Sequence, residues 1–103
     1  MNLHVDFETY SEVNIEDSGA FRYAEDPSTE ALILAYSIGD EEVVGVDLTR
    51  SGEEALRKLT PLFEAIHRGT TICAHNAQFE RLIWTKVCKH FPVTPHERQW
   101  DCT

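Results

Sequence analysis

The order of apolar and polar residues predicts an α/β protein in which a mixed sheet is flanked by helices. Three observations support this class. Residues 3–8 alternate between apolar and polar side chains, residues 31–38 form a largely apolar run, and apolar side chains recur at every fourth position from 79 to 91. Alternation and short apolar runs are typical of strands, whereas four-residue spacing is typical of one helix face. With 103 residues, 42% of them hydrophobic, the chain can form one small domain.

The first half of the chain is expected to supply the strands at the centre of the sheet. In residues 3–8, the apolar side chains would face the core, and the polar ones would lie on the opposite face. Residues 10–30 are rich in Ser, Asp, Gly and Pro, which predicts a long loop holding at most a short turn of helix. Residues 42–48 are expected to pair with residues 31–38 as a hairpin. The first strand should then lie centrally, between this hairpin and residues 70–74.

Helices are expected to alternate with strands in the second half. Thr60 before Pro61 is a typical helix start, so two short helices are predicted at 53–59 and 61–68. Residues 70–74 are β-branched at their start and predict a fourth strand.

The last predicted helix begins after Asn76, which can cap it, and ends at Pro92. Residues 98–103 would begin a fifth strand. The buried stripe of this helix is expected to consist of Phe79, Ile83, Val87 and Phe91.

Composition excludes several classes of protein. No apolar stretch is long enough to span a membrane and the N-terminus lacks signal-peptide features, so a cytoplasmic protein without membrane contact is expected. Cys73, Cys88 and Cys102 are too widely spaced for a disulfide framework or an ordinary zinc site, so we expect reduced thiols. Trp84 and Trp100 are expected to pack in the core or an interface rather than to stack on bases.

The charge balance bears on nucleic-acid binding. A net charge of −9 disfavours a simple DNA-binding module, because phosphate affinity comes mainly from Lys and Arg. It does not disfavour a metal-dependent nuclease, in which clustered carboxylates hold cations that face the phosphate.

Two pairs of polar residues are candidates for such a site. Asp6 and Glu8 lie on one face of the first strand, about 6.5–7 Å apart, and paired carboxylates suit Mg²⁺. Their alternative role is as the polar side of a half-exposed strand. Asn76 and Glu80 lie four residues apart on one helix face. Their alternative roles are a helix cap and a surface acid in the first turn.

Taken together, the two groups resemble a known family. Val5-Asp6-Phe7-Glu8-Thr9 resembles the first motif of the DEDD superfamily of 3′–5′ exonucleases, and His75-Asn76-Ala77-Gln78-Phe79-Glu80 resembles the second. Residues 19–24, 27–30 and 100–103 also resemble the N-terminal exonuclease domain of phage-type family A DNA polymerases. The resemblance covers essentially the whole chain. It implies a ribonuclease H-like fold and a partial exonuclease domain at residues 1–103 that acts on the single-stranded 3′ end of DNA.

The resemblance also implies a site. Two Mg²⁺ or Mn²⁺ ions would lie among Asp6, Glu8 and two further acids, of which Glu80 would be one, in a position where the family usually has Asp. Thr9 and Phe79 would border the terminal nucleotide, and Asn76 would orient the helix end or a phosphate. Asp6, Glu8 and Glu80 should converge closely enough to share a cation. Because like charges repel without metal, at least one of these acids should have a raised pKa.

The third exonuclease motif, a Tyr or His four residues before an Asp, has no match in the sequence; the last acid is Asp101. We therefore expect an incomplete C-terminal part of the fold, weak or no activity of the isolated chain, and completion by a polymerase segment or a second chain. An uncovered sheet face would also favour self-association. The alternative function is a catalytically impaired acidic interaction protein derived from such a domain.

Overall fold

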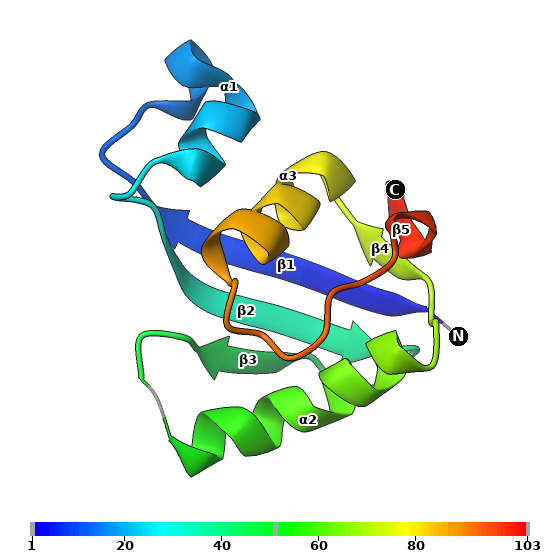
Figure 1. The fold of residues 1–103 in the computed structure, drawn as a ribbon. Helices are drawn as coiled ribbons and strands as arrows, with labels where there is room; N and C mark the ends of the chain where they lie inside the picture. The colour runs from blue at the N-terminus through cyan, green and yellow to red at the C-terminus, as the bar shows by residue number, and fades with distance from the viewer. Residues whose placement is uncertain (1, 51, 103) are drawn as a thin grey trace.

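The structure is a computed structural model and describes residues 2–50 and 52–102, with the side chain of Cys102 left aside. Its centre is a five-stranded sheet in the order β3-β2-β1-β4-β5 (Figure 1). The strands are β1 (Leu3–Tyr10), β2 (Glu30–Ile38), β3 (Val44–Asp47), β4 (Ile72–Ala74) and β5 (Trp100–Cys102).

The strand arrangement confirms the predicted mixed sheet. β1 lies at the centre, antiparallel to β2 and parallel to β4. β2 and β3 form the expected antiparallel hairpin, and β5 continues the sheet parallel to β4. β3 is shorter than predicted, and β1 extends two residues further, to Tyr10. This α/β architecture is consistent with a ribonuclease H-like fold.

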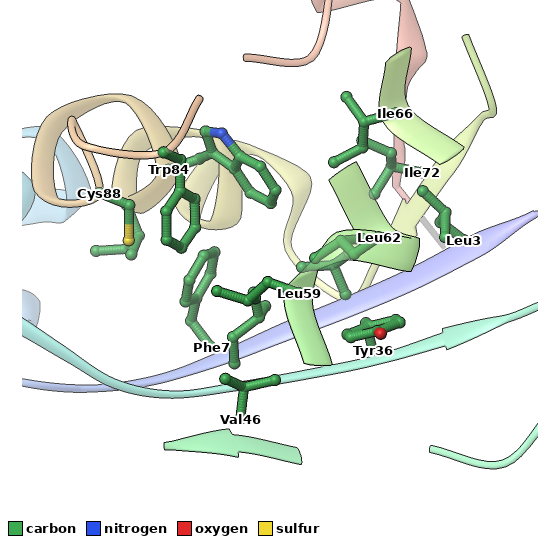
Figure 2. Close-up of a cluster of buried hydrophobic side chains, with 14 of the residues drawn as sticks. Leu3, Phe7, Tyr36, Val46, Leu59, Leu62, Ile66, Ile72, Trp84 and Cys88 are labelled. Carbon is green, nitrogen blue, oxygen red and sulfur yellow. The ribbon is translucent and has the colours of Figure 1, made fainter. Parts of the chain in front are cut away.

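The helices meet the sheet through a common core. α2 (Glu53–His67) and α3 (Ala77–Leu82), which continues as the π-helical segment η1 (Ile83–Val87), contribute buried side chains to the cluster that contains Leu3, Val5 and Phe7. Figure 2 shows Phe7 beside Trp84, and the centroids of the two rings are 6.1 Å apart. The largest fully buried side chains are those of Trp84, Leu3, Leu34, Leu62, Ile72, Ile83 and Val46. The apolar face of β1 is therefore buried against helices, as predicted.

The prediction of a loop over residues 10–30 is wrong for α1 (Ile15–Glu25), which lies beyond the end of β1 (Figure 1). Asn14 caps this helix by accepting a hydrogen bond from the Glu16 N–H, at 2.9 Å. Gly19 interrupts the helical geometry with φ 83°, a value that favours glycine. Because the helix is interrupted at Gly19, its apolar residues do not follow one helical period, and the sequence pattern does not indicate a helix. Packing of Tyr23 and Ala24, both buried, supplies the tertiary stabilisation that local propensity does not indicate.

The predicted helix break at Pro61 is also wrong, because α2 runs through it. Pro61 is exposed, while Leu59 and Leu62 on either side are buried, so one continuous apolar face spans the proline. The Thr60 hydroxyl does not act as a cap; it donates to the Leu56 carbonyl at 2.7 Å. Nearby, the hydroxyl of Tyr36 donates to the Lys58 carbonyl. Packing against the sheet thus outweighs the local preference for a break.

The helix after β4 differs from its predicted pattern. Asn76 caps α3 as expected, but the α-helical part ends at Leu82 and continues as the π-helical η1. The four predicted stripe residues do contribute to the core, since Ile83 and Phe91 are buried and Phe79 and Val87 pack against it half-buried. The prediction was incomplete, because Leu82 and Trp84 are buried as well. Phe91 is buried but lies after the helix, in irregular chain. η2 (Glu97–Gln99), a short 3₁₀ helix, leads into β5.

The burial of the tryptophan and cysteine side chains tests the expectations drawn for them from composition. Trp84 is a core residue whose Nε1 donates to the Val93 carbonyl at 3.0 Å, and Trp100 packs against the same core. Cys73 and Cys88 are buried free thiols, and burial raises the pKa of Cys88 to about 12. The side chain of Cys102 lies outside the described residues, as does Thr103 in the predicted fifth strand. None of the helices in the described part of the chain has the length and apolar character that a membrane span requires.

Candidate functional site

The two acids of β1 lie on the face of the sheet opposite the core. Asp6 and Glu8 are exposed, whereas Val5 and Phe7 are buried, so the strand alternates as its sequence indicates. This placement confirms that Asp6 and Glu8 share one face. Both carboxylates are accessible from solvent, as a metal site on this strand requires.

Glu80 reaches β1 from α3 and is almost fully buried, with 3% of its surface exposed. Its Oε2 accepts a hydrogen bond from the backbone N–H of Phe7 at 3.1 Å. The N–H of Leu3 bonds to the Thr71 carbonyl, and the N–H of Phe7, four residues along, points to the same side of the strand. Because β4 ends at Ala74, no β4 residue pairs with Phe7. The Glu80 carboxylate takes the place of the missing strand partner.

This position perturbs the acid. Burial raises the pKa of Glu80 from its ordinary value of 4.5 to about 7, the hydrogen bond from Phe7 lowers it, and the nearby charge of Asp6 raises it. The expectation of a raised pKa among the three acids is confirmed, but its main cause is burial rather than repulsion. Near neutral pH, the Glu80 carboxyl is consequently divided between its protonated and ionised forms.

The three acids do not form a ready-made ligand set. Among residues 2–50 and 52–102, no group of three or more His, Cys, Asp and Glu side chains is arranged to hold a metal ion. The predicted close convergence of Asp6, Glu8 and Glu80 is therefore not observed. The reason is that Glu80 Oε2 is engaged with the Phe7 N–H inside the protein, while Asp6 and Glu8 extend from the exposed face. The structure places Asp6 near Glu80, close enough to affect its pKa.

The remaining candidate residues lie around these acids. Thr9 follows Glu8 in β1 and is half-buried. Asn76 is exposed, and its side chain accepts a hydrogen bond from the Phe79 N–H at 3.3 Å, so it does fix the start of α3. Phe79 is half-buried, and its ring centroid lies 6.0 Å from that of Tyr23.

Tyr23 is a residue that sequence analysis missed. Its hydroxyl lies 2.8 Å from Thr9 Oγ1, and its ring contacts Phe79, so it touches two of the residues predicted to bind substrate. It was overlooked because residues 10–30 were predicted to be a loop. Two features of the sequence could have indicated a helix here: Asn14 as its capping residue, and the adjacent apolar residues Tyr23 and Ala24 near its end.

Comparison with known proteins relates the chain to a polymerase. No protein-family model matches the sequence. Over 101 residues, 98% of this chain, it is 35% identical to a DNA polymerase of Bacillus phage SP02. The chain spans 15% of the length of that polymerase. The sequence is therefore similar, along nearly its whole length, to one segment of a phage DNA polymerase.

Proposed function

We propose that this chain forms part of a metal-dependent 3′–5′ exonuclease domain that acts on single-stranded 3′ ends of DNA in association with a phage-type DNA polymerase. The observation that carries the proposal is the hydrogen bond between Glu80 and the Phe7 N–H. It joins positions 73 residues apart in sequence, and it brings the acid of α3 to the backbone between Asp6 and Glu8. The similarity to a segment of a phage DNA polymerase supports the polymerase association.

Asp6, Glu8 and Glu80 are not gathered into a ligand set in this structure, but their side-chain chemistry suits a hard divalent cation. Asp6, Glu8 and Glu80 offer only carboxylate oxygens, which are the ligands that Mg²⁺ and Mn²⁺ prefer. Burial and, to a smaller extent, the charge of Asp6 raise the pKa of Glu80, and a cation between the two acids would offset the repulsion from Asp6. When bound, two such ions lower the pKa of a water molecule and stabilise the departing 3′ oxygen.

Each residue would then have a distinct part in the site. Asp6 and Glu8 would hold the cations from the exposed face of β1, and Glu80 would add a carboxylate from α3. Thr9 and Phe79 would border the terminal nucleotide. Asn76 would keep the first turn of α3, and with it Glu80, in place through its bond to the Phe79 N–H.

The proposal is tested by isothermal titration of the chain with Mn²⁺. We expect weak binding that Asp6→Ala abolishes, because this substitution removes a ligand without disturbing the core. Glu42→Ala, which removes an exposed acid from the β2–β3 turn, serves as the matched control and should leave binding unchanged. Mn²⁺ binding that persists in Asp6→Ala would show that the site is assigned to the wrong residues.

A second candidate function is that of an acidic interaction protein with impaired catalysis. The net charge of −9 favours it, as does the lack of a three-residue ligand group among residues 2–50 and 52–102. The two functions differ in their dependence on the acids. Substitution of Asp6 and Glu8 together would be harmless to an interaction protein, whereas it would abolish metal binding and nuclease activity in an exonuclease domain.

A further inference from the structure

Tyr23 connects α1 to both sides of the candidate site. It is buried, with 8% of its surface exposed, and its hydroxyl lies 2.8 Å from the hydroxyl of Thr9 in β1. Its ring packs at a tilt of 47° against Phe79, the residue before Glu80 in α3. The buried hydroxyl of Thr29 donates to the Tyr23 carbonyl and so fixes the end of α1. Tyr23 thus has one contact beside Glu8 and another beside Glu80.

Thr9 lies directly after an irregularity in the sheet. The pairing of β1 with β2 shifts between Glu8 and Thr9, since Glu8 lies opposite Ile33 and Thr9 lies opposite Ala31. Leu32 is the extra residue of this bulge, and a bulge re-aims the side chains next to it. At such a point, a hydroxyl partner from outside the sheet can select one rotamer of Thr9. The Tyr23 hydroxyl is in position to do so.

α1 is also held to η1, the continuation of α3, by contacts of Lys86. The Lys86 ammonium lies 3.4 Å from the Glu25 carboxylate and 5.0 Å from the centroid of the Phe21 ring. Exposed contacts of this kind are individually weak. The buried side chain of Tyr23 is therefore the firmer attachment of α1, and its position depends on packing rather than on charge.

We propose that Tyr23 is a positioning residue for the 3′-terminal nucleotide, an inference that rests on the proposed exonuclease function. Tyr23 fixes the Thr9 hydroxyl by hydrogen bonding and supports the Phe79 ring by packing. With the Tyr23 hydroxyl as donor, Thr9 keeps its own hydrogen for an acceptor oxygen of the nucleotide. α1 then serves as the outer wall of the nucleotide subsite, and Tyr23 acts through Thr9 and Phe79 rather than on the reacting atoms.

The test measures the binding of a 5′-fluorescein-labelled oligothymidylate with a free 3′ end to the full chain in the presence of Mn²⁺, by fluorescence anisotropy. Tyr23→Phe keeps the ring and removes the hydroxyl, and we expect it to weaken binding about fivefold, as the loss of one hydrogen bond would. In a Thr9→Val background, the same substitution should have no further effect, because its partner is already absent. Tyr10→Phe is the matched control: it removes the hydroxyl of an exposed tyrosine next to Thr9 and should leave the affinity unchanged.

The double-mutant comparison distinguishes an effect of Tyr23 that acts through Thr9 from a general destabilisation of the fold. A merely structural role would give the same loss of affinity in the wild-type and Thr9→Val backgrounds, and that result would overturn the inference. Unchanged affinity in Tyr23→Phe, with normal binding by the wild-type chain, would overturn it while leaving the exonuclease function intact. Absence of oligonucleotide binding by the wild-type chain would overturn both. Circular dichroism of each variant verifies that the compared proteins are folded.

Discussion

Replacing Glu80 by glutamine should make the protein more stable at neutral and alkaline pH. The pKa of Glu80 is about 7 in the folded protein against an ordinary value of 4.5. Between these values, the folded state holds a proton that the unfolded chain has released, so stability decreases as the pH rises through this window. At 1.36 kcal/mol for each unit of pKa difference, the loss above pH 7 has an upper limit of about 3 kcal/mol.

Glutamine removes this dependence while keeping the structural contact. It cannot ionise, and its amide oxygen can still accept the hydrogen bond from the Phe7 N–H. We expect the wild-type protein and Glu80→Gln to have similar free energies of unfolding near pH 4.5. At pH 8, the variant should be more stable by about 1–3 kcal/mol.

The assay is urea denaturation of both proteins at pH 4.5, 6, 7 and 8 without divalent cations. Glu42→Gln, a substitution of an exposed glutamate, provides the control and should follow the wild-type curve. A stability difference between wild type and Glu80→Gln that stays constant from pH 4.5 to 8 would refute the reasoning, because it would mean that Glu80 does not titrate differently in the folded state.

Further outcomes are expected from activity and from the fold. The chain alone should release little or no nucleotide from 3′-labelled single-stranded DNA with Mg²⁺, because without the third motif the attacking water is misplaced, which lowers the rate on the order of a hundredfold. Adding the segment that follows the similar region in the phage polymerase should restore release. Robust digestion by the chain alone that is lost in Glu8→Ala would contradict this expectation. Gly19→Ala should lower the free energy of unfolding, measured by thermal denaturation, by about 1 kcal/mol, because residue 19 has a positive φ. Gly45→Ala is the control: an added Cβ meets open space at both positions, and this substitution should leave stability unchanged. Trp84→Ala should cost about 3–5 kcal/mol in urea denaturation, since its ring is buried among other aromatic rings; a loss under 1 kcal/mol would mean that Trp84 is not central to the core.

The sequence predicted the sheet well because strand signals are local. Alternation in β1, the apolar run of β2 and the turn before β3 each identify a strand from a few adjacent residues, and β1 was correctly expected at the centre. The helices were predicted less well. The course of α2 through Pro61 and the helix around Gly19 are decided by packing against distant residues, which local propensity does not reveal.

The sequence predicted the shared face of Asp6 and Glu8 but not the surroundings of Glu80. The side-chain period of a strand places Asp6 and Glu8 on one face, and the structure agrees. The burial of Glu80 depends on where β4 ends relative to β1, because only a missing strand partner leaves the Phe7 N–H for a side chain. That relation joins residues far apart in the chain. The contacts of Tyr23 are of the same kind, since they depend on how α1 packs against β1 and α3.

The identity of residue 80 itself supports a functional role. The fold requires an acceptor for the buried N–H of Phe7, because leaving this group unsatisfied would cost about 1–3 kcal/mol. Glutamine would supply that acceptor without a charge. Glutamate supplies it with a pKa that burial raises and the charge of Asp6 raises further, and therefore with a loss of stability near neutral pH. Packing and hydrogen bonding thus explain a polar side chain at position 80 but not an acidic one. A divalent cation shared with Asp6 would favour the ionised form of Glu80 and offset this loss of stability, as the proposed metal-dependent site requires.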